Sequence, residues 1–157
     1  MNRTGAALFV ALLVASAVVA AVVVHARTPD LELQVTSFTA EICPQGSRGD
    51  CERAAERQHP NRSRPVHRRA RIRFFVRESD PHATVEIVGP NLQRIRPLFA
   101  GPLAADKPVS FVWNGGDAAG NVVSSRDRYR LRVILPSRDR DMVYTRRIQV
   151  FSGGTGR

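Results

Sequence analysis

The feature that most restricts how this chain can fold is a two-residue alternation of side chains on both sides of a glycine-rich turn. Large apolar residues recur at every second position over 109–113, and the same period returns over 129–135 with arginines between them. Asn114, Gly115 and Gly116 follow the first stretch and reach a positive φ at low cost, as tight turns require. Asp117 can accept backbone N–H groups, as Asx turns do. The pattern predicts two half-buried strands joined as a structural hairpin.

The same stretch carries a family resemblance. Residues 111–123 run Phe-x-Trp-Asn-Gly-x-Asp-x-x-Gly-x-x-Val, and a Tyr-x-x-x-Val strand follows at 129–133. This pattern resembles the immunoglobulin-like module of bacterial flagellar hook-capping proteins, which recurs in many exported bacterial proteins unrelated to flagella. Asn114 replaces the first Asp of the usual motif, and Asp127 stands where a Gly is expected. The residues that match it are Trp113, Gly115, Asp117, Gly120, Val123 and Tyr129.

The resemblance covers roughly residues 70–151 and implies an Ig-like β-sandwich. It implies no activity, because the module is a scaffold and a fold does not fix a function. In related exported modules the first strand often leads into a calcium-binding loop rich in Asp and Asn. This chain lacks such a loop, so we expect no metal site and no cofactor.

Alternating stretches elsewhere in the chain extend the predicted sheet. They lie at 31–38, 71–77, 85–87, 95–99 and 142–150, with turns expected at 79–82, 89–91, 101–102 and 136–141. Pro97 should confine its strand to a sheet edge, because proline cannot donate to the ladder. Together with the strands at 109–113 and 129–135, these stretches give about seven short strands, the signature of an all-β sandwich. We therefore expect a sandwich over 28–151, interrupted by an insertion at 43–69 and followed by a flexible tail at 152–157.

An apolar run occupies residues 6–24. At 1.5 Å per residue its roughly 19 residues span about 28 Å, close to the thickness of the bilayer core. The run predicts an uncleaved signal anchor over 1–27, and secretion after cleavage near Ala26 stays open as the alternative. Charges on either side of the run code its orientation weakly, with Arg3 and the amino terminus opposing His25 and Arg27.

Cys43 and Cys51 are the only cysteines, and they bracket a short polar loop. Beyond an apolar leader, such a pair predicts one disulfide in an oxidising compartment. A catalytic Cys-x-x-Cys would need closer spacing, and a zinc site would need more than two ligands. The pair and the resemblance favour placing the domain outside the cytoplasm.

The segment that follows the second cysteine is strongly basic. The chain has a net charge of +10, and Lys107 is its only lysine. Residues 51–58 suit two helical turns, and 59–65 an exposed loop. The arginines of this segment are either plain solvated surface or an anion-binding patch for anionic lipid or a wall polymer. The candidate residues are Arg53, Arg57, Arg62, Arg64, Arg68 and Arg69.

Two classes of function remain after the motifs are considered. The sequence contains no nucleophile elbow, phosphate loop or zinc-protease motif, so we expect no enzyme activity. Nucleic-acid binding is disfavoured, because the aromatic residues occupy core positions of strands and do not alternate with arginines as a stacking platform. The sequence predicts a membrane-anchored module that docks another envelope protein or, as the alternative, a polyanion-binding module acting through the arginines.

Overall fold

The computed structural model describes residues 33–61 and 65–152, which belong to one compact unit, 32–157. The apolar run at 6–24 and residues 153–157 of the predicted tail lie outside the described residues. No helix within the described ranges is long and apolar enough to cross a membrane.

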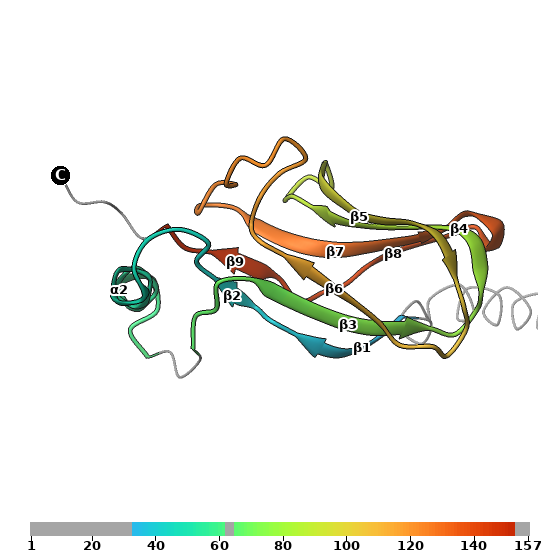
Figure 1. Cartoon of the computed structure of the whole chain (residues 1–157), viewed down its shortest axis with the longest axis horizontal. Helices are drawn as coiled ribbons and strands as arrows, with labels where there is room; N and C mark the ends of the chain where they lie inside the picture. The colour runs from blue at the N-terminus through green and yellow to red at the C-terminus, as the bar shows by residue number, and fades with distance from the viewer. Residues whose placement is uncertain (1–32, 62–64, 153–157) are drawn as a thin grey trace, which may run out of the picture. The chain divides into compact units, whose positions relative to one another are not determined.

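The described residues form two β-sheets and one helix (Figure 1). The three-stranded sheet has the order β1-β3-β6, and the larger sheet has the order β2-β9-β7-β4-β5, with β8 also paired to β7. The strands are β1 (Leu33–Phe38), β2 (Glu41–Ile42), β3 (Ala70–Val76), β4 (Asp80–Val88), β5 (Arg94–Leu103), β6 (Val109–Trp113), β7 (Arg128–Leu135), β8 (Arg140–Val143) and β9 (Ile148–Val150). Helix α2 spans Arg48–Gln58, and a short 3-10 turn, η1, spans Pro136–Arg138. The described residues are thus mostly β, which is consistent with the predicted all-β sandwich.

A single apolar core joins the two sheets. It takes Ile72, Phe74 and Val76 from β3 and every second residue of β7 from Tyr129 to Leu135, all of them buried. The alternation seen in the sequence is therefore the alternation between core and solvent. Trp113 of β6 and Tyr129 of β7 meet edge to face, with ring centroids 5.3 Å apart. This contact connects one sheet to the other.

The predicted hairpin around the glycine-rich turn is wrong. β6 pairs with β3, whereas β7 pairs with β4, β8 and β9 in the other sheet. Residues 114–127 therefore cross between sheets. The turn closes on itself, because the Gly120 N–H donates to the Asp117 carbonyl and the Val123 N–H to the Gly115 carbonyl. These local bonds satisfy the turn without bringing its flanking strands together.

Four further expectations are corrected. The turn expected at 79–82 is the start of β4, where the buried Asp80 carboxylate accepts from the backbone N–H groups of His82 and Ser137. The strand expected at 142–150 is split into β8 and β9, which pair with successive parts of β7. The turn expected at 101–102 is part of β5, which extends through Gly101 and Pro102 to Leu103. The described residues form nine strands, where about seven were expected. β5 is nevertheless the last strand of its sheet, which confirms the edge position predicted from Pro97.

Candidate binding surface

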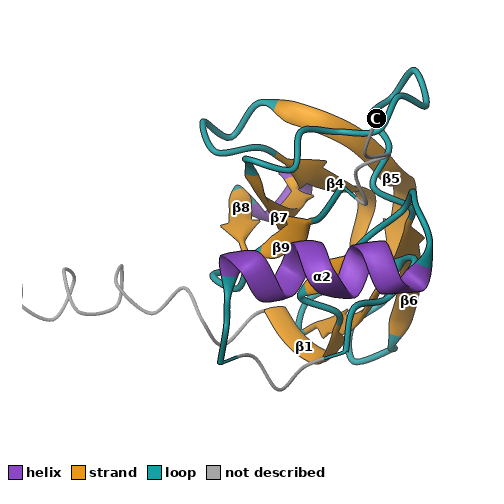
Figure 2. Cartoon of the chain, turned by 90° about the vertical axis from the view of Figure 1, so that its left-hand side faces the viewer, coloured by secondary structure: helices purple, strands orange, loops and turns teal. Residues whose placement is uncertain are grey.

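A disulfide holds helix α2 at one end of the sandwich. Cys43 directly follows β2, and Cys51 lies in the first half of α2; their sulfur atoms are bonded at 2.04 Å. The predicted disulfide is therefore present. Figure 2 shows α2 lying across the ends of the strands. Its buried face, formed by Cys51, Ala54 and Ala55, packs with Phe151 beyond β9.

The sequence of α2 accounts for where the helix begins. Ser47 is the N-cap, and its hydroxyl oxygen accepts from the Asp50 backbone N–H at 3.1 Å. Asp50 also suits the positive end of the helix dipole. The hydrogen bond from Ser47, followed by the one from Arg53, lowers the pKa of the Asp50 carboxyl. The helix predicted at 51–58 is confirmed and begins three residues earlier, at Arg48.

The structure describes four of the six candidate arginines, two on helix α2 and two in the segment before β3. Arg53 and Arg57 lie on α2, where Arg53 pairs with Asp50 at 2.5 Å. Arg62 and Arg64 lie outside the described residues. Arg68 and Arg69 are exposed in the segment that leads into β3.

Arg68 and Arg69 lie beside Arg71, the second residue of β3, around a surface depression of about 410 Å³. We call this site the basic depression. No acidic side chain lines it, and none of these three arginines has an ion pair within residues 33–61 and 65–152. Its lining residues are Thr39, His67, Arg68, Arg69, Arg71 and Val112.

Backbone hydrogen bonds hold the walls of the basic depression in place. The Thr39 N–H donates to the Arg71 carbonyl at 3.0 Å, and the Arg71 N–H donates to the Thr39 hydroxyl at 3.2 Å. The His67 N–H donates to the Glu41 carbonyl, and the Cys43 N–H donates to the His67 carbonyl. The arginine side chains are therefore presented from a fixed backbone, which lowers the entropy cost of binding an anion.

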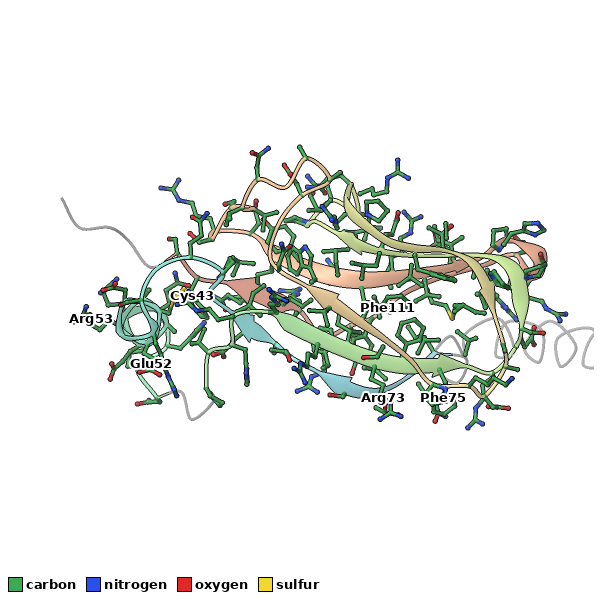
Figure 3. All side chains as sticks on the ribbon, viewed as in Figure 1. Cys43, Glu52, Arg53, Arg73, Phe75 and Phe111 are labelled. Atoms are coloured by element: carbon green, nitrogen blue, oxygen red, sulfur yellow. A yellow bond between two sulfur atoms is a disulfide. The ribbon has the colours of Figure 1, made fainter. Side chains whose placement is uncertain are left out.

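The basic depression continues onto the outer face of the three-stranded sheet. Arg71 lies directly opposite Val112 of β6, and Arg73 lies opposite Ser110. Because directly opposed residues of an antiparallel pair share a face, all four side chains point away from the core. In Figure 3, Arg73 and Phe75 project outward from β3, whereas Phe111 projects into the space between the sheets. Val112 is a large apolar residue, and its side chain is 52% exposed.

The motif residues at 113–129 serve the fold. The Trp113 indole N–H donates to the Gly116 carbonyl at 2.8 Å, and the Asp117 carboxylate accepts from the Asn121 N–H at 2.9 Å. Gly115 and Gly120 have φ of 75° and 89°, values that disfavour other residues. The Tyr129 hydroxyl donates to the Ser124 carbonyl at 3.0 Å. Two further motif residues complete the turn: the Asn114 side chain accepts from the Gly116 N–H, and Val123 packs against the core.

One charged cluster was missed by sequence reasoning. Arg132 of β7 binds Asp141 of β8 through two nitrogens, at 2.5 and 2.7 Å, and contacts the buried Glu86 of β4 at 3.2 Å. The Arg132 guanidinium lowers the pKa of Asp141. Only the strand register reveals this cluster, since Glu86 lies 46 positions before Arg132 in the sequence. Through these contacts Arg132 connects β7 to both β4 and β8.

Within the described ranges, no three histidine, cysteine or acidic residues are grouped so that they could hold a metal ion. No protein-family model, curated protein or solved structure matches the chain.

Proposed function

We propose that this protein is a non-catalytic interaction module, displayed outside the cytoplasm and held at the cytoplasmic membrane by its apolar run at 6–24. In this proposal the sandwich docks another protein of the cell envelope. The observation that carries the proposal is the Cys43–Cys51 disulfide. Disulfides persist in oxidising compartments and are rare in the cytosol, where thiols are kept reduced.

Two contacts support the finer assignment to an Ig-like sandwich. The Tyr129 hydroxyl binds the backbone carbonyl of Ser124, five residues upstream. Ig-type sandwiches contain a tyrosine corner of this kind, with the tyrosine near the start of its strand. Tyr129 is the second residue of β7 and packs against the buried Trp113 of the facing sheet. The resemblance to the module of hook-capping proteins agrees with this assignment, although direct hook capping is not part of the proposal.

Protease accessibility tests the location and the anchor together. Protease added to intact spheroplasts should digest the sandwich, while untreated protein should remain in the membrane fraction as the full chain. Protection of the sandwich from external protease would contradict the location. Recovery of a soluble form cut near Ala26 would contradict the anchor and favour secretion after cleavage.

The basic depression favours a second candidate function, the binding of a phosphate-bearing polyanion. Guanidinium groups donate two parallel hydrogen bonds to phosphate oxygens, and Arg68, Arg69 and Arg71 have no competing acid at the site. Anionic lipid and a phosphate-bearing wall polymer present the same chemistry. Such contacts weaken steeply as salt rises.

Inorganic polyphosphate and anionic liposomes are suitable probes for this candidate. The full chain in neutral detergent should bind polyphosphate, and a variant with Arg68→Gln and Arg69→Gln should bind it several-fold more weakly. The matched control carries Arg94→Gln and Arg126→Gln, which remove the same charge from exposed sites elsewhere. Equal binding of polyphosphate by the two variants would show that the basic depression is not the binding site. Liposomes bearing the reconstituted chain then separate a lipid ligand from a soluble polymer.

A further inference from the structure

Strand β6 is the least protected edge among the described strands. It lies at one end of the order β1-β3-β6 and pairs with no described strand other than β3. Native sheets usually protect their edges with prolines, bulges, charged residues or very short strands, because an open edge can pair with another chain. β5 carries two prolines and bulges, β1 has a register shift, β2 has only two residues, and β8 carries Arg140 and Asp141.

β6 has none of these protections. Its sequence, Val-Ser-Phe-Val-Trp, is uncharged, contains no proline and pairs with β3 in an unbroken register. Valine and aromatic residues also favour extended backbone. Its two outward side chains are those of Ser110 and Val112. The edge therefore offers free backbone donors and acceptors beside a partly apolar surface.

The charge beside this edge is positive and uncompensated. Arg71 and Arg73 lie one strand inward on the same outer face, and none of the three strands of this sheet contains an acidic residue. Neither arginine has an ion pair in the part of the chain that the structure describes. Beyond Arg71 the face leads into the basic depression, which Val112 also lines.

We propose that β6 binds an extended acidic segment of a partner protein, which adds as a fourth strand to the three-stranded sheet. This inference rests on the proposed interaction function and names its surface and the chemistry of its partner. The added strand gains main-chain hydrogen bonds to β6, and its alternate side chains specify which segment binds. Acidic side chains on the outer face would lie two strand spacings, about 9–10 Å, from the backbone of β3. The long side chains of Arg71 and Arg73 reach toward them across β6.

The same charges disfavour pairing between two copies of this chain. Joining two β6 edges would place the arginines of both β3 strands on one continuous face of a sheet. The chain already carries a net charge of +10, so self-association also brings two strongly positive molecules together. An acidic partner turns this repulsion into attraction and increases the rate of association.

The test uses the full chain in neutral detergent and two labelled peptides, one of alternating threonine and glutamate and one of alternating threonine and lysine. The glutamate peptide should bind about tenfold more tightly than the lysine peptide, because it faces two arginines across the edge. On binding, amide hydrogen exchange should slow at 109–113 and stay unchanged in β1. Protection confined to β6 identifies strand addition, which purely electrostatic binding would not produce.

Charge reversal provides the decisive variant. Arg71→Glu with Arg73→Glu should invert the preference, so that the lysine peptide binds more tightly and still protects 109–113. The matched control, Arg94→Glu with Arg126→Glu, changes net charge equally at exposed sites outside the three-stranded sheet and should keep the original preference. Both variants should retain the cooperative unfolding of the parent chain, since all four arginines are exposed.

Several outcomes would overturn the proposal. Binding without slower exchange at 109–113, or an unchanged preference after charge reversal, would show that β6 is not the site. Slow exchange at β6 in a dimer without peptide would assign the edge to a second copy of the chain. If polyphosphate displaces the glutamate peptide and leaves exchange at β6 unaltered, the surface belongs to an anionic polymer. These results are independent of the protease test, so failure here is distinguishable from failure of the proposed location.

Discussion

Trp113 is the residue on which the account of the fold depends most. It is 1% exposed, contacts Tyr129 across the sheets and donates its indole hydrogen bond to Gly116. Trp113→Ala should therefore lower the free energy of unfolding by about 3–5 kcal/mol, measured by urea denaturation. Trp113→Phe keeps a ring but loses the hydrogen bond, so it should cost less. An alanine variant with unchanged stability would show that the indole is exposed and part of a binding face.

Tyr129 should make stability fall at alkaline pH. Burial, followed by the charge of Asp127, raises the pKa of its hydroxyl from 10.0 to about 12. The folded state thus keeps the phenol neutral where the unfolded state already ionises it. The contribution is fully present below pH 10 and is lost as pH rises from 10 toward 12. Urea denaturation across this range should show the fall, and Tyr129→Phe should reduce it. An equal fall in the phenylalanine variant would contradict the assignment.

At the scale of elements, the disulfide and helix α2 form one unit. The loop closed by the bond is short, with the cysteines eight residues apart, and the helix buries only a small apolar face. Replacing both cysteines with alanine should lower the stability of the domain by roughly 2–3 kcal/mol, on the chain-entropy estimate. Amide exchange should accelerate first at Ala54 and Ala55, and the central residues of β3 should change least. Uniform acceleration through α2 and β3 would show that the helix is not a separate unit.

The elements differ in how well the sequence predicts them. β3 and β7 were predictable because each shows the two-residue period along its whole length, and burial follows that period. The pairing of β6 with β3 was not predictable. Strands that are neighbours in the sequence can belong to different sheets, and the local side-chain pattern does not indicate which sheet each one joins. β8 and β9 were predicted as one strand because their apolar residues continue one pattern in the sequence. In the structure they pair with successive parts of β7.

The candidate binding surface was predicted only in part, for a related reason. Arg68 and Arg69 were found from the local concentration of charge. Arg71 of β3 also lines the depression. So does Thr39, which lies more than thirty positions earlier in the sequence and is hydrogen-bonded to Arg71 through its backbone N–H and its hydroxyl. Arg53, another of the candidate arginines, pairs with Asp50 on helix α2. Long-range register and local ion pairing thus decide which charges are available to a partner.

At the scale of the whole described unit, the two sheets differ in whether their strands contain acidic residues that can pair with arginine. The larger sheet contains acidic residues, and Arg132 pairs with two of them, Glu86 and Asp141. The three-stranded sheet keeps Arg71 and Arg73 without an acid in any of its strands. This uncompensated charge lies next to the open edge of β6, which is the face we propose for an acidic partner. The proposed function requires that this face be accessible outside the cytoplasm.

Lys107 permits the most direct measurement of whether the sandwich is accessible outside the cytoplasm. It is the only lysine in the chain and is exposed in the turn between β5 and β6. A membrane-impermeant amine reagent applied to intact spheroplasts should modify Lys107, and peptide mass spectrometry should find the label there. A Lys107→Arg variant, which keeps the charge, should lose it. If Lys107 becomes modified only after the cells are lysed, the sandwich lies inside the cytoplasm and the account is contradicted.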